Sequence, residues 1–279
     1  MSDNVERLLP SHYSAESTLH ALRQSRQEHP QLADLLALHE DILALQALAE
    51  GEGESATGPL PLPDGRTRDL AEGTPWLRFD DLALDENGFA RAVRQIAAVL
   101  QQYRQEWAGE AVSADPAELL ALAQKAVEGR RSLIQDETGL TEASVELAIE
   151  AEMRRMAGRV ASRLDLDQWR RGKCPFCGSA PALSLLEPSV GARFLFCQRC
   201  HTSWSFPRTG CAFCSNDTSL TYHTTDDEAY RLYVCPVCQK YLKTVDLRRL
   251  SGEVNPAVEN LLTVGLDLAA EERGYRREA

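Results

Sequence analysis

The residues of this sequence most suited to chemistry are its eight cysteines, which form four Cys-x-x-Cys pairs. The pairs are Cys174/Cys177, Cys197/Cys200, Cys211/Cys214 and Cys235/Cys238. A Cys-x-x-Cys turn directs two sulfur atoms to one side, and two turns that face each other supply the four ligands of a tetrahedral metal site. The sequence therefore predicts two four-cysteine sites that bind two tetrahedral metal ions.

The spacing of the pairs indicates two copies of one unit. Consecutive pairs are separated by 19, 10 and 20 residues, and the run Arg193–Phe196 before the second pair matches Arg231–Val234 before the fourth. Extended runs at 182–186 and 220–224 lie at the same place in each unit. We expect each unit to be a knuckle, two strands joined by a turn, and a second knuckle, with the first pair facing the second and the third facing the fourth. A cross-braced arrangement, in which the first pair faces the third, stays open.

The spacing leaves the metal open between zinc and iron. Four thiolates in a tetrahedron suit Zn²⁺, which would be structural, and equally a single rubredoxin-type iron, which would allow one-electron chemistry. The first residues lack a basic segment followed by an apolar one, and no apolar run is long enough to span a bilayer. These features predict a cytoplasmic protein, a compartment in which clustered thiols stay reduced and bind metal.

Further side chains near the knuckles could assist the metal sites or contact a partner. Arg193, Arg199, Arg208 and Arg231 could donate hydrogen bonds to sulfur or meet an acidic partner, with solvent-exposed surface as the alternative. Trp204 and Tyr241 are more typical of the core of a ribbon than of a platform for nucleic-acid bases. We expect His201 to lie outside the ligand sets, because eight cysteines already complete two sites.

The segments that must position these sites are mainly helical. Apolar periodicity predicts helices at 32–49, 87–107, 115–129 and 141–164, with a Gly/Pro-rich loop or linker at 50–79 and a last helical tract within 246–275. Asp115 and Pro116 form a cap and first position typical of a helix start. The predicted fold is α+β: an acidic helical domain over 1–170, metal modules at 171–208 and 209–245, and a C-terminal helix within 246–279.

The distribution of charge favours a protein partner. The chain has 30 basic and 42 acidic side chains, a net charge of −12. Residues 1–173 carry 19 basic and 30 acidic side chains, whereas residues 174–240 carry five of each. A nucleic-acid surface normally needs a basic excess, so we expect no nucleic acid to bind. A nucleic-acid-binding double zinc ribbon and a rubredoxin-type electron-transfer protein remain the two alternatives.

The cysteine region resembles the formate dehydrogenase accessory protein family, FdhE. The residues that carry the resemblance are Cys174–Pro181, Arg193–Cys200, Trp204, Arg208, Cys211, Cys214, the acidic run Asp226–Glu228, and Cys235–Lys243 with its Tyr-Leu-Lys ending. The resemblance covers roughly residues 170 to 275.

The resemblance implies a maturation factor or chaperone and not an enzyme. Such a protein would bind the catalytic subunit of respiratory formate dehydrogenase before its export and hold iron in rubredoxin-like sites. It adds Lys243, at the end of the last motif, to the residues that could contact a site or a partner. The sequence leaves open whether the protein forms a homodimer.

Overall fold

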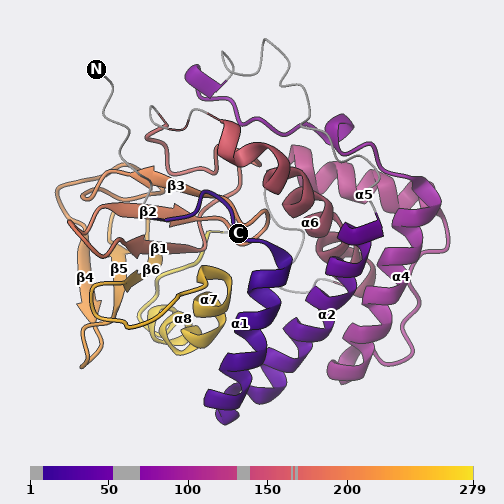
Figure 1. Cartoon of the computed structure of the whole chain (residues 1–279), viewed down its shortest axis with the longest axis horizontal. Coiled ribbons are helices and arrows are strands. Elements are labelled where there is room, and N and C mark those ends of the chain that lie inside the picture. Colours follow the sequence, from indigo (N-terminus) through magenta and orange to yellow (C-terminus); the bar gives the residue numbers. More distant parts are fainter. Residues whose placement is uncertain (1–8, 53–69, 131–138, 165, 167–168, 279) are drawn as a thin grey trace.

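The chain folds into a group of helices beside one β-sheet (Figure 1). A computed structural model describes residues 9–52, 70–130, 139–164, 166 and 169–278. In Figure 1, the helices between residues 33 and 160 gather on one side of the molecule and the strands on the other, while the last two helices of the described chain lie below the sheet. The sequence prediction of mixed helices and strands, with the helices mainly in the N-terminal part, is confirmed.

The helical part contains the four predicted helices and one that was not predicted. The helices are α1 (Ala15–Glu28), α2 (Ala33–Glu52), α4 (Glu86–Tyr103), α5 (Pro116–Glu128) and α6 (Leu140–Val160). Short 3₁₀ turns lie at Pro30–Leu32, Phe79–Leu82, Gln105–Trp107 and Ala161–Arg163. The sequence of α1 is largely polar, with Ala15, Thr18 and Leu22 as its buried residues. A cap fixes its start, because Ser14 Oγ accepts a hydrogen bond from the N–H of Ser17 at 3.1 Å.

The predicted amphipathic pattern is clearest in α4 and α5. In α4 the buried face includes Phe89, Val93 and Ile96, and this helix packs against α2, α5 and α6. At the start of α5, Asp115 Oδ1 accepts a hydrogen bond from the N–H of Ala117 at 3.0 Å, and Pro116 takes the first helical position. Local chemistry therefore fixes the position of both helices along the chain.

The two cysteine units share one six-stranded sheet. The strands are β1 (Leu183–Leu186), β2 (Arg193–Phe196), β3 (Ser203–Phe206), β4 (Thr221–Thr224), β5 (Tyr230–Cys235) and β6 (Lys240–Asp246). Their spatial order is β3-β2-β1-β6-β5-β4. All neighbours are antiparallel except β1 and β6, which pair in parallel with Leu183 opposite Lys243. Each unit is thus a three-stranded meander, and the parallel pair joins the two meanders.

The sequence analysis missed the third strand of each unit. The strands β3 and β6 begin directly after the second knuckle of their units, and β6 occupies residues up to Asp246, where the last helical tract was expected to start. Two short helices, α7 (Pro256–Leu262) and α8 (Val264–Glu271), form the end of the chain in place of one. Asn255 caps α7 by accepting a hydrogen bond from the N–H of Ala257 at 3.1 Å.

One hydrophobic core runs from the helices into the first cysteine unit. Ile96 of α4, Met153 of α6, Phe176 and Trp204 are all buried in this core. A second cluster lies under the sheet, where Leu185 and Val245 pack with Ala257 of α7. The helical part and the first unit therefore bury the same apolar surface, and the boundaries of the domains along the chain stay a prediction.

The loop predicted for 50–79 falls partly outside the described residues, since 53–69 belong to the part that the structure does not describe. At its far end Trp76 and Leu77 are buried. Their N–H groups donate hydrogen bonds to the carbonyls of Pro175 and Phe176 at 2.9 and 2.8 Å. The end of this segment therefore pairs with the first knuckle. Of the helices in the described ranges, none combines the length and the apolar character that crossing a bilayer requires.

A short N-terminal segment also pairs with the first unit. The N–H of Ser203 donates to the carbonyl of Ser11 at 2.9 Å, and the N–H of Tyr13 donates to that of His201 at 3.2 Å. The backbone of His12, between Ser11 and Tyr13, forms an antiparallel β-bridge with Thr202. Burial, together with the positive charge of Arg154, lowers the pKa of His12 to about 4.

We expect His12 to make the protein less stable in acid. An unfolded histidine takes up its proton near pH 6.5, whereas folded His12 stays neutral down to about pH 4, so stability is lost as the pH falls between these values. In urea unfolding, His12→Gln should remove up to about 2 kcal/mol of the loss between pH 6.5 and pH 5. The matched comparison is His20→Gln in the exposed part of α1. An unchanged slope in His12→Gln would contradict this assignment.

Candidate metal centres

The four Cys-x-x-Cys knuckles share one backbone geometry. In each, the residue after the second cysteine has a positive φ, between 55° and 81°, and its N–H donates to the carbonyl of the first cysteine at 2.8–2.9 Å. These residues are Gly178, His201, Ser215 and Gln239. The left-handed conformation is favourable only for glycine. Three of the four positions therefore hold a strained residue, which the sequence analysis had no signal to find.

The structure brings the eight sulfur atoms into two groups of four. Cys174, Cys177, Cys197 and Cys200 form the first centre, and Cys211, Cys214, Cys235 and Cys238 form the second. Within each centre the sulfur atoms all lie within 4.8 Å of one another. The first pair thus faces the second and the third faces the fourth, as the repeat favoured, and the described geometry is not cross-braced.

The spacing of the sulfur atoms fits a tetrahedral metal ion. The Sγ atoms of Cys174 and Cys200, and those of Cys177 and Cys197, are 3.5 Å apart. In the second centre the corresponding separations, across Cys211/Cys238 and Cys214/Cys235, are 3.7 Å. A tetrahedron with metal–sulfur bonds of about 2.3 Å has edges of about 3.8 Å. Each centre could therefore hold one ion, and a four-sulfur set suits zinc and iron alike.

The first centre is enclosed by protein. Its four cysteines are at most 2% exposed. Arg199 lies between Cys197 and Cys200 in the sequence, and its side chain reaches the helices. Its Nε lies 2.7 Å from Glu146 Oε1 of α6, and its Nη2 donates to the carbonyl of Ala126 in α5 at 3.3 Å. Its Nη1 donates to Ser179 Oγ at 2.8 Å. The sequence led us to expect Arg199 to contact sulfur, an external partner or solvent. In the structure it connects the second knuckle to the helical part of its own chain.

The buried charges continue along α6. Burial, and next the negative charge of Glu146, raise the pKa of Glu150 above the usual range of a carboxyl. Arg154 Nη1 lies 3.7 Å from Glu150 Oε2, and Arg154 also donates to the side chain of Gln46 in α2. A continuous polar network thus leads from the first centre through α6 to α2.

The residues predicted to surround the first centre are inside the protein. Trp204 is fully buried and its Nε1 donates to the carbonyl of Arg171 at 3.0 Å. His201 is also buried, and its Nδ1 lies 3.3 Å from the carbonyl oxygen of Tyr13. His201 is not part of either sulfur group. Both side chains belong to the packing around the knuckle.

Arg193 lies where the two units meet. Its Nη1 donates to the carbonyl of Gly210, just before the third knuckle, and its Nε donates to Ser184 Oγ, both at 3.0 Å. The guanidinium also lies 4.9 Å from the centre of the Tyr233 ring. Burial lowers its pKa to about 10, which still leaves a cation at neutral pH. Arg193 therefore ties the first unit to the second.

Tyr241 and Lys243 of β6 hold the C-terminal helices against the sheet. Lys243 Nζ donates to Asp267 Oδ2 and to the carbonyl of Asn260, both at 2.7 Å. The hydroxyl of Tyr241 donates to the other oxygen of Asp267 at 2.9 Å. Burial lowers the pKa of Lys243 to about 8. In this structure both side chains make contacts inside the chain.

The remaining two predicted arginines lie near the sheet surface. Arg231 Nη2 donates to Asp246 Oδ2 at 2.6 Å, and Arg208 Nη1 donates to the carbonyl of Val190 at 3.5 Å. Across the described residues, the hydrogen bonds of the predicted arginines go to carboxylates, hydroxyls and backbone carbonyls, and not to sulfur.

The second centre is far more open than the first. Cys211 and Cys235 are buried, but Cys238 is half-buried and Cys214 is exposed. Val237, between the cysteines of the fourth knuckle, is 61% exposed. The N–H of Phe213 lies 3.5 Å from the sulfur of Cys211. The repeated spacing of the cysteines did not indicate this difference.

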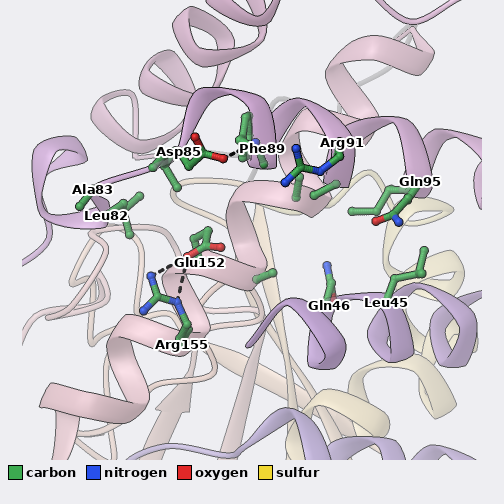
Figure 2. A pocket seen from close by; sticks show the side chains of 16 residues that line it. Leu45, Gln46, Leu82, Ala83, Asp85, Phe89, Arg91, Gln95, Glu152 and Arg155 are labelled. Carbon is green, nitrogen blue, oxygen red and sulfur yellow. Dashed lines mark hydrogen bonds and ion pairs between the residues drawn. The ribbon is translucent and has the colours of Figure 1, made fainter. Parts of the chain in front are cut away.

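A separate pocket of about 540 Å³ lies among the helices (Figure 2). Its walls come from α2, α4, α6 and the segment before α4, with apolar side chains such as Phe89 and charged ones such as Arg91 and Glu152. Figure 2 shows Arg155 paired with Glu152 and Gln46 pointing toward the pocket. Gln46 also belongs to the polar network of α6. The pocket was not predicted from the sequence because its residues come from distant segments.

Comparisons with known proteins agree with the resemblance drawn from the cysteine motifs. Residues 173–208 match the family model described as FdhE, central domain, and residues 209–279 match that of the FdhE C-terminal domain. A protein FdhE homolog of Aquifex aeolicus is 38% identical over 119 residues, 40% of this chain and 42% of the relative. Protein FdhE of Escherichia coli K12 is 32% identical over 114 residues, 39% of this chain and 37% of the relative. The matched stretch therefore spans less than half the length of these relatives.

The fold of the whole chain also has a solved counterpart. The crystal structure of the FdhE protein from Pseudomonas aeruginosa has a TM-score of 0.64 to this structure, with 23% sequence identity and 96% of each chain covered. The likeness shows that the helical part and the sheet share the architecture of that protein. The two domain matches place the similarity to FdhE in residues 173–279, the region that contains the cysteine motifs.

Removing Glu146 should destabilise the protein strongly. Glu146→Ala removes the carboxylate that lies 2.7 Å from the buried Arg199 guanidinium, and breaking a buried pair in this way costs about 3 kcal/mol or more. Glu152→Ala is the matched control on the same helix. Glu152 pairs with Arg155 at a half-buried position, where such pairs contribute less than about 1 kcal/mol. Equal losses in urea unfolding of the two metal-loaded variants would contradict the proposed importance of the Arg199 contact.

Proposed function

We propose, from the premise that residues 173–279 belong to the FdhE family, that this protein is an accessory factor for the maturation of respiratory formate dehydrogenase. In this role it binds the catalytic subunit in the cytoplasm before export, and it is not itself an enzyme. The observation that carries the proposal is the match of both FdhE domains to the region that contains the two four-cysteine centres.

The chemistry of the two centres supports a binding role. A catalytic zinc site keeps an open position for water or substrate, whereas four cysteine ligands fill a tetrahedral site. Ions in these centres would therefore stabilise the knuckles, or carry single electrons if they are iron. The excess of acidic side chains in residues 1–173 supports a protein partner with basic segments over a nucleic acid.

We expect the purified protein to contain about two metal ions per chain, one for each centre. Iron is the metal that the family resemblance implies, so protein purified without oxygen should be coloured and should bleach reversibly on reduction. Elemental analysis together with a visible spectrum measures both properties. A colourless protein with two zinc ions would overturn the assignment of iron and the alternative of rubredoxin-type electron transfer.

We expect loss of the protein to lower the activity of respiratory formate dehydrogenase. A strain without its gene should regain activity when it carries the native gene, but not when it carries Cys177→Ser, because that cysteine belongs to the enclosed centre. Immunoblotting controls for the abundance of the variant, and Glu152→Ala serves as a variant that should restore activity. Pull-down of the native protein should recover the catalytic subunit. Full activity in the strain without the gene would end the proposal.

A further inference from the structure

The two metal centres have the same knuckles but opposite surroundings. In the first centre every cysteine is at most 2% exposed. In the second, the third knuckle contributes the exposed Cys214 and the fourth contributes the half-buried Cys238. Each short sulfur–sulfur edge of the second centre thus joins a buried cysteine to a more accessible one. Solvent reaches the second centre from the side of Cys214 and Cys238.

The first centre cannot open without disturbing the core of the helices. The ring of Phe176, inside the first knuckle, stacks on Trp76 with ring centres 5.6 Å apart. Trp204 belongs to the same buried core as the four cysteines, and Arg199 extends from the second knuckle to the buried Glu146. Release of a ligand from this centre would expose all these groups, so it requires unfolding of the core.

The second centre is fixed on one side only. A Cβ atom placed on Gly172 would lie 1.6 Å from the carbonyl oxygen of Ala212, so the backbone before the first knuckle closely contacts the third knuckle. The ring of Phe213 lies under the ammonium of Lys240 at 5.7 Å. On the other side, Val237 points to solvent. Ala212 and Phe213 of the third knuckle pack against the edge of the core, but Cys214 is exposed and Cys238 is half-buried, so an entering ligand can reach both sulfur atoms from solvent.

We propose that the second centre is the exchangeable metal centre of this protein, and that Cys214 is the ligand replaced first when a thiolate or a chelator approaches. In the exchange step a bond forms between the metal and the entering ligand as the bond between the metal and Cys214 Sγ breaks. The released thiolate takes a proton from water, and the oxidation state of the metal does not change. The first centre keeps its ion for as long as the chain stays folded.

The inference rests on metal binding by the two centres and is independent of the role in formate dehydrogenase maturation. Because opening the first centre requires unfolding of a native domain, its exchange should be at least about a thousandfold slower than local exchange at the second centre. The difference in rate is therefore large enough to separate the two centres in one experiment.

The test uses the full chain reconstituted with two zinc ions and treated with excess EDTA under native conditions. We expect one ion to leave rapidly while tryptophan fluorescence stays unchanged, and the other to leave at least about a thousandfold more slowly, together with unfolding. Alkylation followed by mass spectrometry should label Cys214 and Cys238 in the fast phase and leave Cys174, Cys177, Cys197 and Cys200 protected. Release of both ions at one rate, or labelling of the first centre in the fast phase, would overturn the proposal.

Matched variants separate exchange from loss of the fold. Cys214→Ser should weaken binding of one zinc ion and leave the thermal unfolding of the helical core close to that of the native protein. Cys177→Ser, the equivalent position of the first unit, should lower the unfolding temperature markedly. Equal thermal shifts in the two variants, or a reconstituted native chain that holds fewer than two zinc ions, would also count against the proposal. None of these measurements uses formate dehydrogenase, so their outcomes are distinct from that of the maturation test.

Discussion

The contact between the first four-cysteine centre and the helices is the constraint on which the rest of the structure depends. The first knuckle lies inside the hydrophobic core, with Phe176 stacked on Trp76, and the second sends Arg199 to the buried Glu146. Burying a charge is costly unless its partner is placed well. The Arg199–Glu146 pair therefore specifies one orientation of the sheet relative to α6. The metal ion and the helical core would stabilise each other, because neither knuckle can take this position with its sulfur atoms apart.

The charges under the other face of the sheet have a similar role. Lys243 and Tyr241 share Asp267, and this group fixes α8 against β6. Arg193 connects the sheet to the third knuckle in the same way. The structure therefore uses its buried cations to join elements, whereas the cation beside the third knuckle, Lys240, is partly exposed and lies over the ring of Phe213. The difference between the two centres follows from what packs on them, since their ligands are the same.

The local features could be predicted from the sequence, and those that depend on distant partners could not. Two Cys-x-x-Cys turns with a repeated gap predict the sulfur groups, because the ligand spacing is encoded within each unit. The periodicity of Phe89, Val93 and Ile96 predicts α4 for the same reason. The strand β6 was missed because it is completed by a parallel neighbour, β1, from the other unit. Arg199 was read as a surface residue or a sulfur contact because its partner Glu146 lies 53 residues away in the chain.

The parallel pairing of β1 with β6 has a consequence for the synthesis of the chain on the ribosome. The strand β1 belongs to the first unit, but its second neighbour is the last strand to be synthesised. Until β6 emerges, one edge of β1 carries unpaired N–H and C=O groups next to the apolar side chains of Leu183 and Leu185, which is the type of edge that recruits other nascent chains. The first unit can bring together its own four cysteines but cannot complete its own sheet, so the pairing of β6 with β1 closes the sheet.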